Sequence, residues 1–199
     1  MPWNKLVHLG DIAITVPAAA AITSWLMATR AWRMAFWWSF LFVVGIGLVA
    51  ASKVAFLGWG HELEGLDFKA LSGHATGVTA VAPTLLYLLL QQHSAALRMA
   101  GVAVGLAFGL SISSLLVVLE HHSLSEALAG FLMGALISLG GIRMASDVPS
   151  GKPLTHWICF GLVFLAAAWL MKSAPVGYWM IRAALVLSGN SRPYAWDSD

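Results

Sequence analysis

The apolar run MAFWWSFLFVVGIGLVAASKVAFL, residues Met34–Leu57, decides the class of fold. Lys53 is the one charged residue within it. The run exceeds the roughly 20 residues that a helix needs to cross ~30 Å of hydrocarbon. We therefore expect Met34–Leu57 to form a transmembrane helix.

Five further runs share this apolar character. Of the 199 residues, 59% are hydrophobic and 10% are charged, whereas soluble domains carry about 25% charged residues. Mean hydropathy is +0.80. The sequence thus predicts an all-α integral membrane protein, a six-transmembrane-helix bundle that forms one membrane-embedded domain over residues 1–199. The other five predicted spans are Ile12–Ala28, Ala75–Leu90, Ala100–Leu119, Leu124–Ile142 and Leu154–Met171.

The C-terminal segment, the single cysteine and the net charge exclude some other structures and partners. The segment PVGYWMIRAALVLSG, Pro175–Gly189, is apolar but short and contains Arg182, so we expect an interfacial helix rather than a seventh span. A single cysteine, Cys159, excludes an internal disulfide. The formal net charge of +2 is too small to indicate a nucleic-acid partner. No signal-peptide pattern precedes the first run, which is expected to remain as a helix.

Alternation of the six spans places three short connections on one face of the membrane. Of the 11 Lys and Arg residues, five lie on this face and six on the other, so the positive-inside rule gives a near tie. Because the five are packed into very short connections, we expect this face to be cytoplasmic. The protein would then be a multi-pass protein of the bacterial inner membrane. The five residues are Arg30, Arg33, Arg98, Arg143 and Lys152, with Asp147 beside them.

Ionisable residues at membrane depth are costly and point to function. They gather in three places on the opposite face, which we expect to be periplasmic. Alternation of the spans brings these places to one side, whichever side is cytoplasmic. They are Lys53 near the end of the second span, Ser72, Gly73 and His74 at the start of the third, and Glu120, His121, His122 and Glu126 around the start of the fifth.

His122 and Glu126 are four residues apart, so they share one face of a helix that begins there. A carboxylate beside an imidazole fixes its tautomer and stabilises its protonated form. Ser123 and Glu126 also fit a capping box, Ser-x-x-Glu, at a helix N-terminus. The two interpretations are compatible, and the sequence leaves both open.

The triplet Ser72, Gly73 and His74 suggests an anion site. Backbone N–H groups at a helix N-terminus favour phosphate, glycine permits close approach, and a serine hydroxyl adds a donor. Lys53 would supply a cation for the same phosphate. The alternatives are a serine cap on an ordinary helix start and a lysine that extends to the membrane interface.

These residues resemble the motifs of the type-2 phosphatidic acid phosphatase family, the integral-membrane relatives of the vanadium haloperoxidases. The family pattern is K-x6-R-P, then P-S-G-H, then S-R-x5-H-x3-D. Lys53 matches the first lysine, LSGH at Leu71–His74 matches the second block, and His122 with Glu126 matches H-x3-D. Leu71 replaces the proline, and Glu126 replaces the aspartate but keeps the carboxylate. The resemblance covers about residues 53–134.

The arginine positions of the pattern are different in this chain. The first-block Arg-Pro falls on Gly60 and His61, and the third-block Ser-Arg falls on Leu115 and Leu116. Both bidentate phosphate donors of the family are therefore missing, and a lysine cannot imitate them. This departure weakens the expectation of full catalytic power.

The resemblance implies a role for each matched residue. His122 would be the nucleophile that carries the phosphoryl group, His74 the general acid, and Glu126 the group that orients His122. The phosphate-binding groups would be Lys53, Ser72 and the backbone of Gly73.

Several nearby residues could assist this site. His61 and His121 would replace the missing arginine charge when protonated, or they are ordinary interfacial histidines. Trp59 and Asp67 lie in the same connecting loop as His61 and are further accessory candidates. The histidines also suggest zinc, but no cysteine accompanies them and the family is metal-independent. We therefore expect neither a metal nor a cofactor.

The sequence thus predicts a phosphatase that removes phosphate from a lipid phosphate or pyrophosphate embedded in the bilayer. Polyprenyl pyrophosphate is the first expected substrate, on the breadth of the family. Two alternatives stay open: a degenerate relative that binds or moves lipid phosphates without turnover, and a lipid phosphotransferase. No feature of the sequence indicates an oligomeric state.

Overall fold

The computed structural model describes residues 6–144 and 153–195. This part of the chain contains seven α-helices and no strand, with one isolated bridge between Leu63 and Phe68. Two short 3-10 turns, η1 (His8–Gly10) and η2 (Glu64–Leu66), complete the elements. The helices are α2 (Ile12–Ala28), α3 (Trp32–Trp59), α4 (Gly73–Leu89), α5 (Ala95–Val118), α6 (Leu124–Arg143), α7 (Pro153–Met171) and α8 (Val176–Ser188).

Each of the six apolar runs forms one of the helices α2 to α7, which confirms the all-α fold. The expected C-terminal helix is α8, which is bent by 55° from α7. Among the described residues, α3, α5 and α6 are long and apolar enough to cross a membrane. The α7–α8 pair adds a fourth if it counts as one span. The membrane character is therefore supported by three to four helices, and six crossings stay a prediction.

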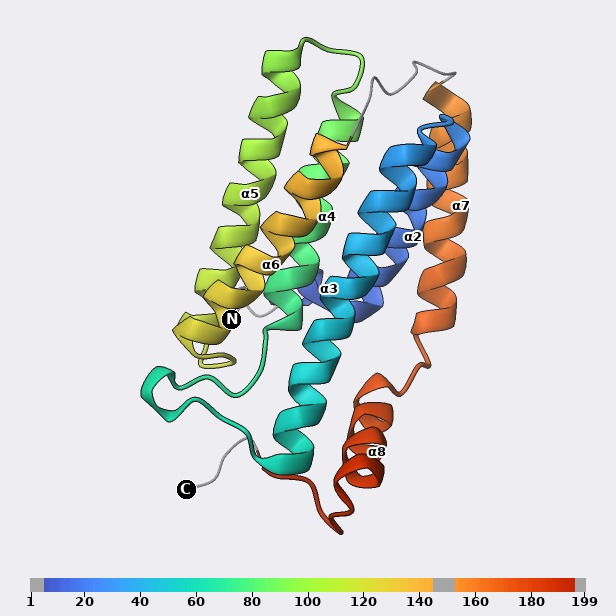
Figure 1. Ribbon diagram of the computed structural model, residues 1–199. Coiled ribbons are helices and arrows are strands. Elements are labelled where there is room, and N and C mark those ends of the chain that lie inside the picture. The colour runs from blue at the N-terminus through green and yellow to red at the C-terminus, as the bar shows by residue number, and fades with distance from the viewer. Residues whose placement is uncertain (1–5, 145–152, 196–199) are drawn as a thin grey trace.

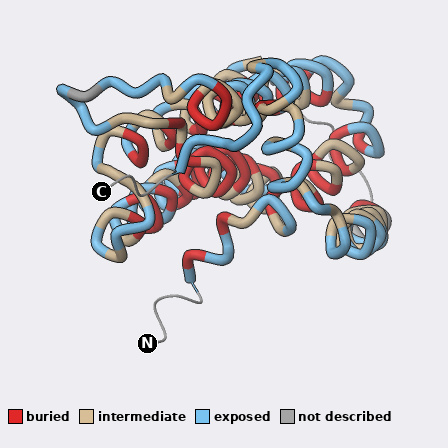
Figure 2. Tube along the Cα trace, turned by 90° about the horizontal axis from the view of Figure 1, so that it is seen from below, coloured by how far each residue is buried: buried red, intermediate tan, exposed pale blue. Residues whose placement is uncertain are grey.

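Helix α4 lies at the centre of the bundle, between α5, α6 and α3 (Figure 1). Seen along the bundle, its residues form the main buried column (Figure 2). Glycines on the neighbouring helices allow this close packing. A Cβ on Gly105 of α5 would lie 2.5 Å from the Pro83 Cα, and a Cβ on Gly134 of α6 would lie 2.5 Å from the Thr76 carbonyl oxygen. These small residues therefore allow the helix backbones to approach closely.

Helix α7 packs on the outside of the bundle, against α2. The Trp25 ring contacts Trp157 edge-on, with ring centroids 4.9 Å apart. Inside the bundle, the Trp38 Nε1–H donates to the Thr84 hydroxyl at 2.8 Å, which satisfies the indole where no water reaches it.

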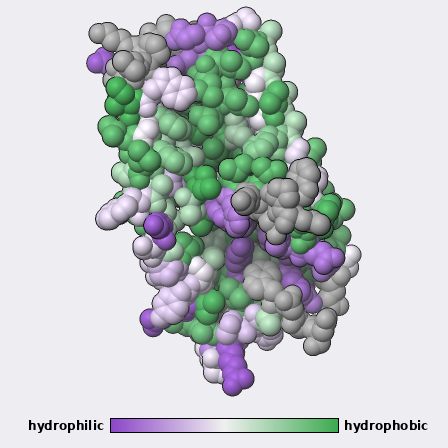
Figure 3. All heavy atoms as spheres, turned by 180° about the vertical axis from the view of Figure 1, so that it is seen from behind, coloured by the Kyte–Doolittle hydropathy of each residue, from purple (hydrophilic) through white to green (hydrophobic). Residues whose placement is uncertain are grey.

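Large apolar side chains cover much of the outside. Phe36, Val43, Leu136, Leu162 and Trp169 are all more than half exposed. Figure 3 shows a broad hydrophobic surface over the upper half of one face, with hydrophilic patches at its top edge and across the lower half. A lipid-facing surface accounts for this pattern, because such a large apolar area is unusual on a soluble monomer.

The two ends of the bundle differ in what they carry. The α2–α3 and α4–α5 connections lie at the upper end in Figure 1, with Arg30, Arg33 and Arg98 in or beside them. The α3–α4 and α5–α6 connections lie at the lower end, beside Lys53, His74 and His122. Arg30, Arg33 and Arg98 therefore lie at the opposite end from the candidate site residues, as the alternation predicts. Asp147 and Lys152 lie outside the described residues.

Candidate active site

His122 and Glu126 form a buried pair at the start of α6. The His122 Nδ1 lies 2.7 Å from Glu126 Oε2, and the two side chains are 12% and 6% exposed. Because a carboxylate only accepts hydrogen bonds, Nδ1 carries the proton and donates it. The neutral ring then presents the lone pair of Nε2, which is the atom available for attack or for proton transfer.

The capping box predicted for the same residues is also present. The Glu126 N–H donates to the Ser123 hydroxyl at 3.3 Å, and the Ser123 N–H donates to Glu126 Oε2 at 3.4 Å. One carboxylate thus caps α6 and holds an imidazole. The two contacts that the sequence left open, the His122–Glu126 pair and the Ser123–Glu126 capping box, are thus both present in the structure.

The other oxygen of Glu126 fixes the loop before α4. Glu126 Oε1 accepts hydrogen bonds from the backbone N–H groups of Lys69 at 2.9 Å and Ala70 at 3.0 Å. With four donors around it, the carboxylate uses nearly all its acceptor capacity. This explains how α6 positions the residues that lead into Ser72 and His74.

Ser72 is a helix cap in this structure. Its hydroxyl accepts from the Ala75 N–H at 3.4 Å, and the residue is completely buried. Its own N–H donates to the Glu126 carbonyl at 3.3 Å. Gly73 follows and lines a cavity, whereas Ser72 is not among the residues that line it. The serine cap predicted as an alternative is therefore present, and the direct phosphate role of the Ser72 hydroxyl stays a prediction.

His74 pairs with an aspartate from the N-terminal segment. The His74 Nε2 lies 2.6 Å from Asp11 Oδ1, and the other oxygen, Oδ2, lies 2.8 Å from the His8 Nδ1. His74 is the second residue of α4. The Asp11 carboxylate in contact with its ring stabilises the protonated form of the imidazole.

Sequence reasoning missed Asp11 and His8 as site residues. Their spacing, His-x-x-Asp directly before an apolar run, was a signal that the two side chains could meet. Nothing in the spacing connects them with His74, because 63 residues separate Asp11 from it.

Three adjoining hollows surround these groups. The first, of about 410 Å³, is named here the histidine pocket. The second, of about 340 Å³, is named the α8 pocket. A third, of about 220 Å³, contacts both because it is lined by Asp11 and His74 together with Lys53 and Gly177. The histidine pocket is lined by Val7, His8, Asp11, His74, Leu116, His121 and His122, and the α8 pocket by Lys53, Leu57, His121, His122, Gly177, Met180 and Ile181.

The structure therefore brings together Lys53, His74, His121 and His122, which come from three separate parts of the sequence. Lys53 interacts electrostatically with Glu126, and His74 interacts with Lys53 and His122. An imidazole nitrogen, a second imidazole and an ammonium group around three adjoining hollows can attack, protonate and bind a phosphate ester.

The positions of the two missing arginines have different surroundings. Leu116 is 1% exposed and lines the histidine pocket, so an apolar side chain stands where the family carries a guanidinium. Gly60 ends α3 in a left-handed conformation, with φ of 64°, and a Cβ there would lie 2.7 Å from the Tyr194 ring. Neither position supplies a charge to the cavity.

Three of the four accessory candidates lie apart from this cavity. His61 lines a separate hollow on another face of α3, together with Glu62, Phe68 and Lys69. Trp59 is 44% exposed at the end of α3. Asp67 contributes its carbonyl oxygen to a hydrogen bond from the Ser125 hydroxyl, at 3.2 Å. Only His121 lines the cavity, so it alone remains placed to supplement the charge of Lys53.

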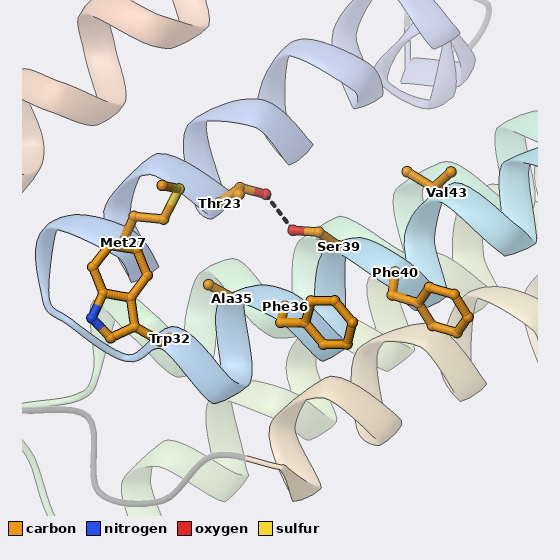
Figure 4. Close-up of a pocket in the computed structure, with 8 residues that line it drawn as sticks. All are labelled: Thr23, Met27, Trp32, Ala35, Phe36, Ser39, Phe40 and Val43. Atoms are coloured by element: carbon orange, nitrogen blue, oxygen red, sulfur yellow. Dashed lines mark hydrogen bonds between the residues drawn. The ribbon is translucent and has the colours of Figure 1, made fainter.

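A hollow of similar size lies elsewhere. A groove of about 450 Å³ runs between α2 and α3 (Figure 4), and none of its described lining residues is ionisable. Size alone therefore does not identify the site. In the described part of the chain, no group of three or more His, Cys, Asp or Glu side chains is arranged to hold a metal ion.

Comparison with known proteins leaves the function open. No family model and no solved structure matches the chain. A relative from Klebsiella pneumoniae, "Uncharacterized 22.5 kDa protein in cps region", is 38% identical over 136 residues. The match covers 68% of this chain and 65% of that protein, so the chain spans less than two thirds of the relative's length.

Proposed function

We propose that this protein is an integral-membrane phosphatase that hydrolyses a lipid phosphate or pyrophosphate through a phosphohistidine intermediate. The proposal includes membership of the type-2 phosphatidic acid phosphatase family, on the motif resemblance. One observation carries it: Glu126 holds Nδ1 of His122, which leaves Nε2 for attack where adjoining hollows also bring His74 and Lys53.

The proposed reaction has two steps. Nε2 of His122 attacks phosphorus and the bond to the leaving oxygen breaks, while His74 donates its proton to that oxygen. Water then attacks phosphorus and the phosphorus–nitrogen bond breaks, while neutral His74 accepts a proton from this water. Inorganic phosphate leaves, and Nε2 of His122 is free again. Lys53 balances charge on the phosphate oxygens in both steps, and Glu126 stabilises the positive charge that develops on His122.

The apolar side of the cavity supports a lipid substrate. Leu57 of α3 and Met180 and Ile181 of α8 line the α8 pocket beside Lys53. A phosphate bound at Lys53 and His122 would thus place the attached chain against apolar side chains between α3 and α8. We take polyprenyl pyrophosphate as the first substrate to test.

The proposed setting is the bacterial inner membrane, with α2 to α7 as six crossings and the cavity facing the periplasm. The bacterial source of the Klebsiella relative accords with this setting. In a Cys159→Ala background, cysteines at Gly65 and at Gln92 should react with impermeant reagents from opposite sides. Reaction of both from one side would overturn the alternation.

The activity itself is tested with purified protein in detergent and a panel of lipid phosphates. Wild-type protein should release inorganic phosphate, and the His122→Ala variant should not. Chelators should leave the rate unchanged, and vanadate should inhibit as a phosphate mimic. Loss of activity with EDTA and its return with zinc would overturn the histidine mechanism.

A second function is favoured by Leu116 and Gly60. With no arginine at either position, the chain could bind or transfer a lipid phosphate without hydrolysis. Binding of a lipid phosphate that depends on Lys53, with no phosphate release from any substrate, would establish this alternative. Transfer of phosphate to a second lipid would identify a phosphotransferase.

A further inference from the structure

The N-terminal segment packs directly against His74. Turn η1 contacts α4, and a Cβ on Gly10 would lie 2.8 Å from the His74 carbonyl oxygen and 2.9 Å from its Cβ. Such an approach requires the absence of a side chain at Gly10. The segment His8–Asp11 is therefore held at a fixed place beside His74, outside the part of the chain that carries the family motifs.

Asp11 uses this placement to contact His74 through a short hydrogen bond. Its Oδ1 lies 2.6 Å from the His74 Nε2, and its Oδ2 lies 2.8 Å from the His8 Nδ1. The His74 and Asp11 side chains are 31% and 36% exposed, and both line the histidine pocket. The contact is thus part of the cavity wall, where a bound substrate would meet it.

We infer that Asp11 is a positioning residue for His74 and that the segment His8–Asp11 completes the site. The inference rests on the proposed phosphatase function, in which His74 is the general acid. The N–H at Nε2 donates to Asp11, so the ring orientation is fixed and Nδ1 is the nitrogen that gives its proton to the leaving oxygen. After that transfer the ring is neutral and Nε2 still donates to Asp11, so the proton count balances.

Other charged groups also act on His74. Lys53 from α3 favours its neutral form because its ammonium group is positive, and His122 from the start of α6 does the same whenever its own ring carries charge. His121 lines the same pocket, His8 contacts the far oxygen of Asp11, and Glu126 is occupied by His122 and the loop N–H groups. Asp11 is the carboxylate in direct contact with His74, so among these groups it stabilises the protonated ring most directly.

The test uses the full-length protein and the variants Asp11→Asn and Asp11→Glu. Asp11→Asn should lower kcat by about 10- to 100-fold, less than the 10²–10⁴-fold typical of losing a general acid, and should leave KM nearly unchanged. The alkaline limb of the pH–rate profile should move to lower pH by about one unit or more. Asp11→Glu should restore part of the rate. Glu62→Gln, at an exposed acidic residue in a different hollow, is the matched control and should behave as wild type.

A purely structural role of Asp11 would lower the yield or stability of folded protein without moving the pH profile. An unchanged kcat and profile in Asp11→Asn, in a protein whose activity still requires His122, would overturn the inference and leave the phosphatase proposal intact.

A second readout does not need turnover. In ¹⁵N-histidine spectra of the detergent-solubilised protein, the His74 titration should move to lower pH in Asp11→Asn, while the His93 signal should not move. An unchanged His74 titration would overturn the inference even if no substrate were hydrolysed.

Discussion

The two ends of the bundle each contain a hollow of similar size but of opposite chemistry. The groove between α2 and α3 measures about 450 Å³, and its described lining carries the hydroxyls of Thr23 and Ser39, joined at 2.8 Å, but no ionisable side chain (Figure 4). The histidine pocket measures about 410 Å³, and three of its imidazoles contact a carboxylate: His8 and His74 contact Asp11, and His122 contacts Glu126 behind the pocket wall. The difference shows that connected ionisable groups, rather than volume, distinguish a candidate site in a membrane protein.

Solvation explains why this difference is informative. In hydrocarbon every polar group must find a partner within the protein. A hydroxyl pair meets that demand with two ordinary side chains. An ionisable residue at the edge of the bundle costs far more and is retained where it serves function. Variants at the histidine pocket should therefore change turnover, whereas variants in the groove between α2 and α3 should change only stability.

The largest effect is expected at His122. His122→Ala removes the proposed nucleophile, so phosphate release should fall to background and no acid-labile phosphohistidine should form when labelled substrate is mixed with the protein. His93→Ala, an exposed histidine at the opposite end of the bundle, is the matched control and should retain full activity. Equal activity in both variants would show that turnover does not depend on the end of the bundle that contains His122.

Lys53 should come second. The charge-assisted hydrogen bonds of a lysine are worth roughly 1.5–3 kcal/mol each, and the apolar Leu116 and Gly60 offer no substitute. Lys53→Ala should therefore be nearly as damaging as His122→Ala when phosphate release is measured. Lys172→Ala removes an exposed lysine just beyond α7 and should have little effect. If Lys53→Ala kept most of the activity, phosphate would bind elsewhere.

A smaller effect is expected in the α8 pocket. A Cβ on Gly177 would meet nothing within 4 Å, so Gly177→Trp should fold but fill the pocket. KM for a long-chain lipid phosphate should rise by about tenfold, which corresponds to ~1.4 kcal/mol of lost binding. KM for a short soluble phosphate ester should rise less. Gly161→Trp on α7, where a Cβ is equally unobstructed, is the control. Equal effects on both substrates would place the lipid chain outside this pocket.

The helices and one half of the site could be predicted from the sequence because they depend on local rules. The length of each apolar run predicts a helix, and a serine just before the first turn predicts its N-terminal cap. The spacing of four residues predicts that His122 and Glu126 meet on one helix face. Glu126 in particular follows from its place in the first turn of α6, where it reaches both the cap and the imidazole.

The other half of the site depends on contacts between distant segments. Asp11 meets His74 only because η1 packs on α4, and α8 contributes to the cavity only because the chain bends after α7. Conversely, His61 is close to Lys53 in sequence, but α3 ends at Gly60 and the chain leads His61 to another face. Spacing along the chain cannot specify such outcomes.

The smallest effect is expected at Thr23, in the apolar groove. The Thr23 hydroxyl donates to the Ala19 carbonyl at 2.9 Å and accepts from the Ser39 hydroxyl, so Thr23→Val removes both bonds with little change of shape. Hydrogen bonds between helices in membrane proteins average about 0.6 kcal/mol in double-mutant cycles, with a maximum near 1.7. Thr23→Val, Ser39→Ala and the double variant should show a coupling energy of about this size in reversible unfolding, with kcat within twofold of wild type. A tenfold loss of kcat would show that this end also contributes to turnover, which would end the contrast between the two hollows.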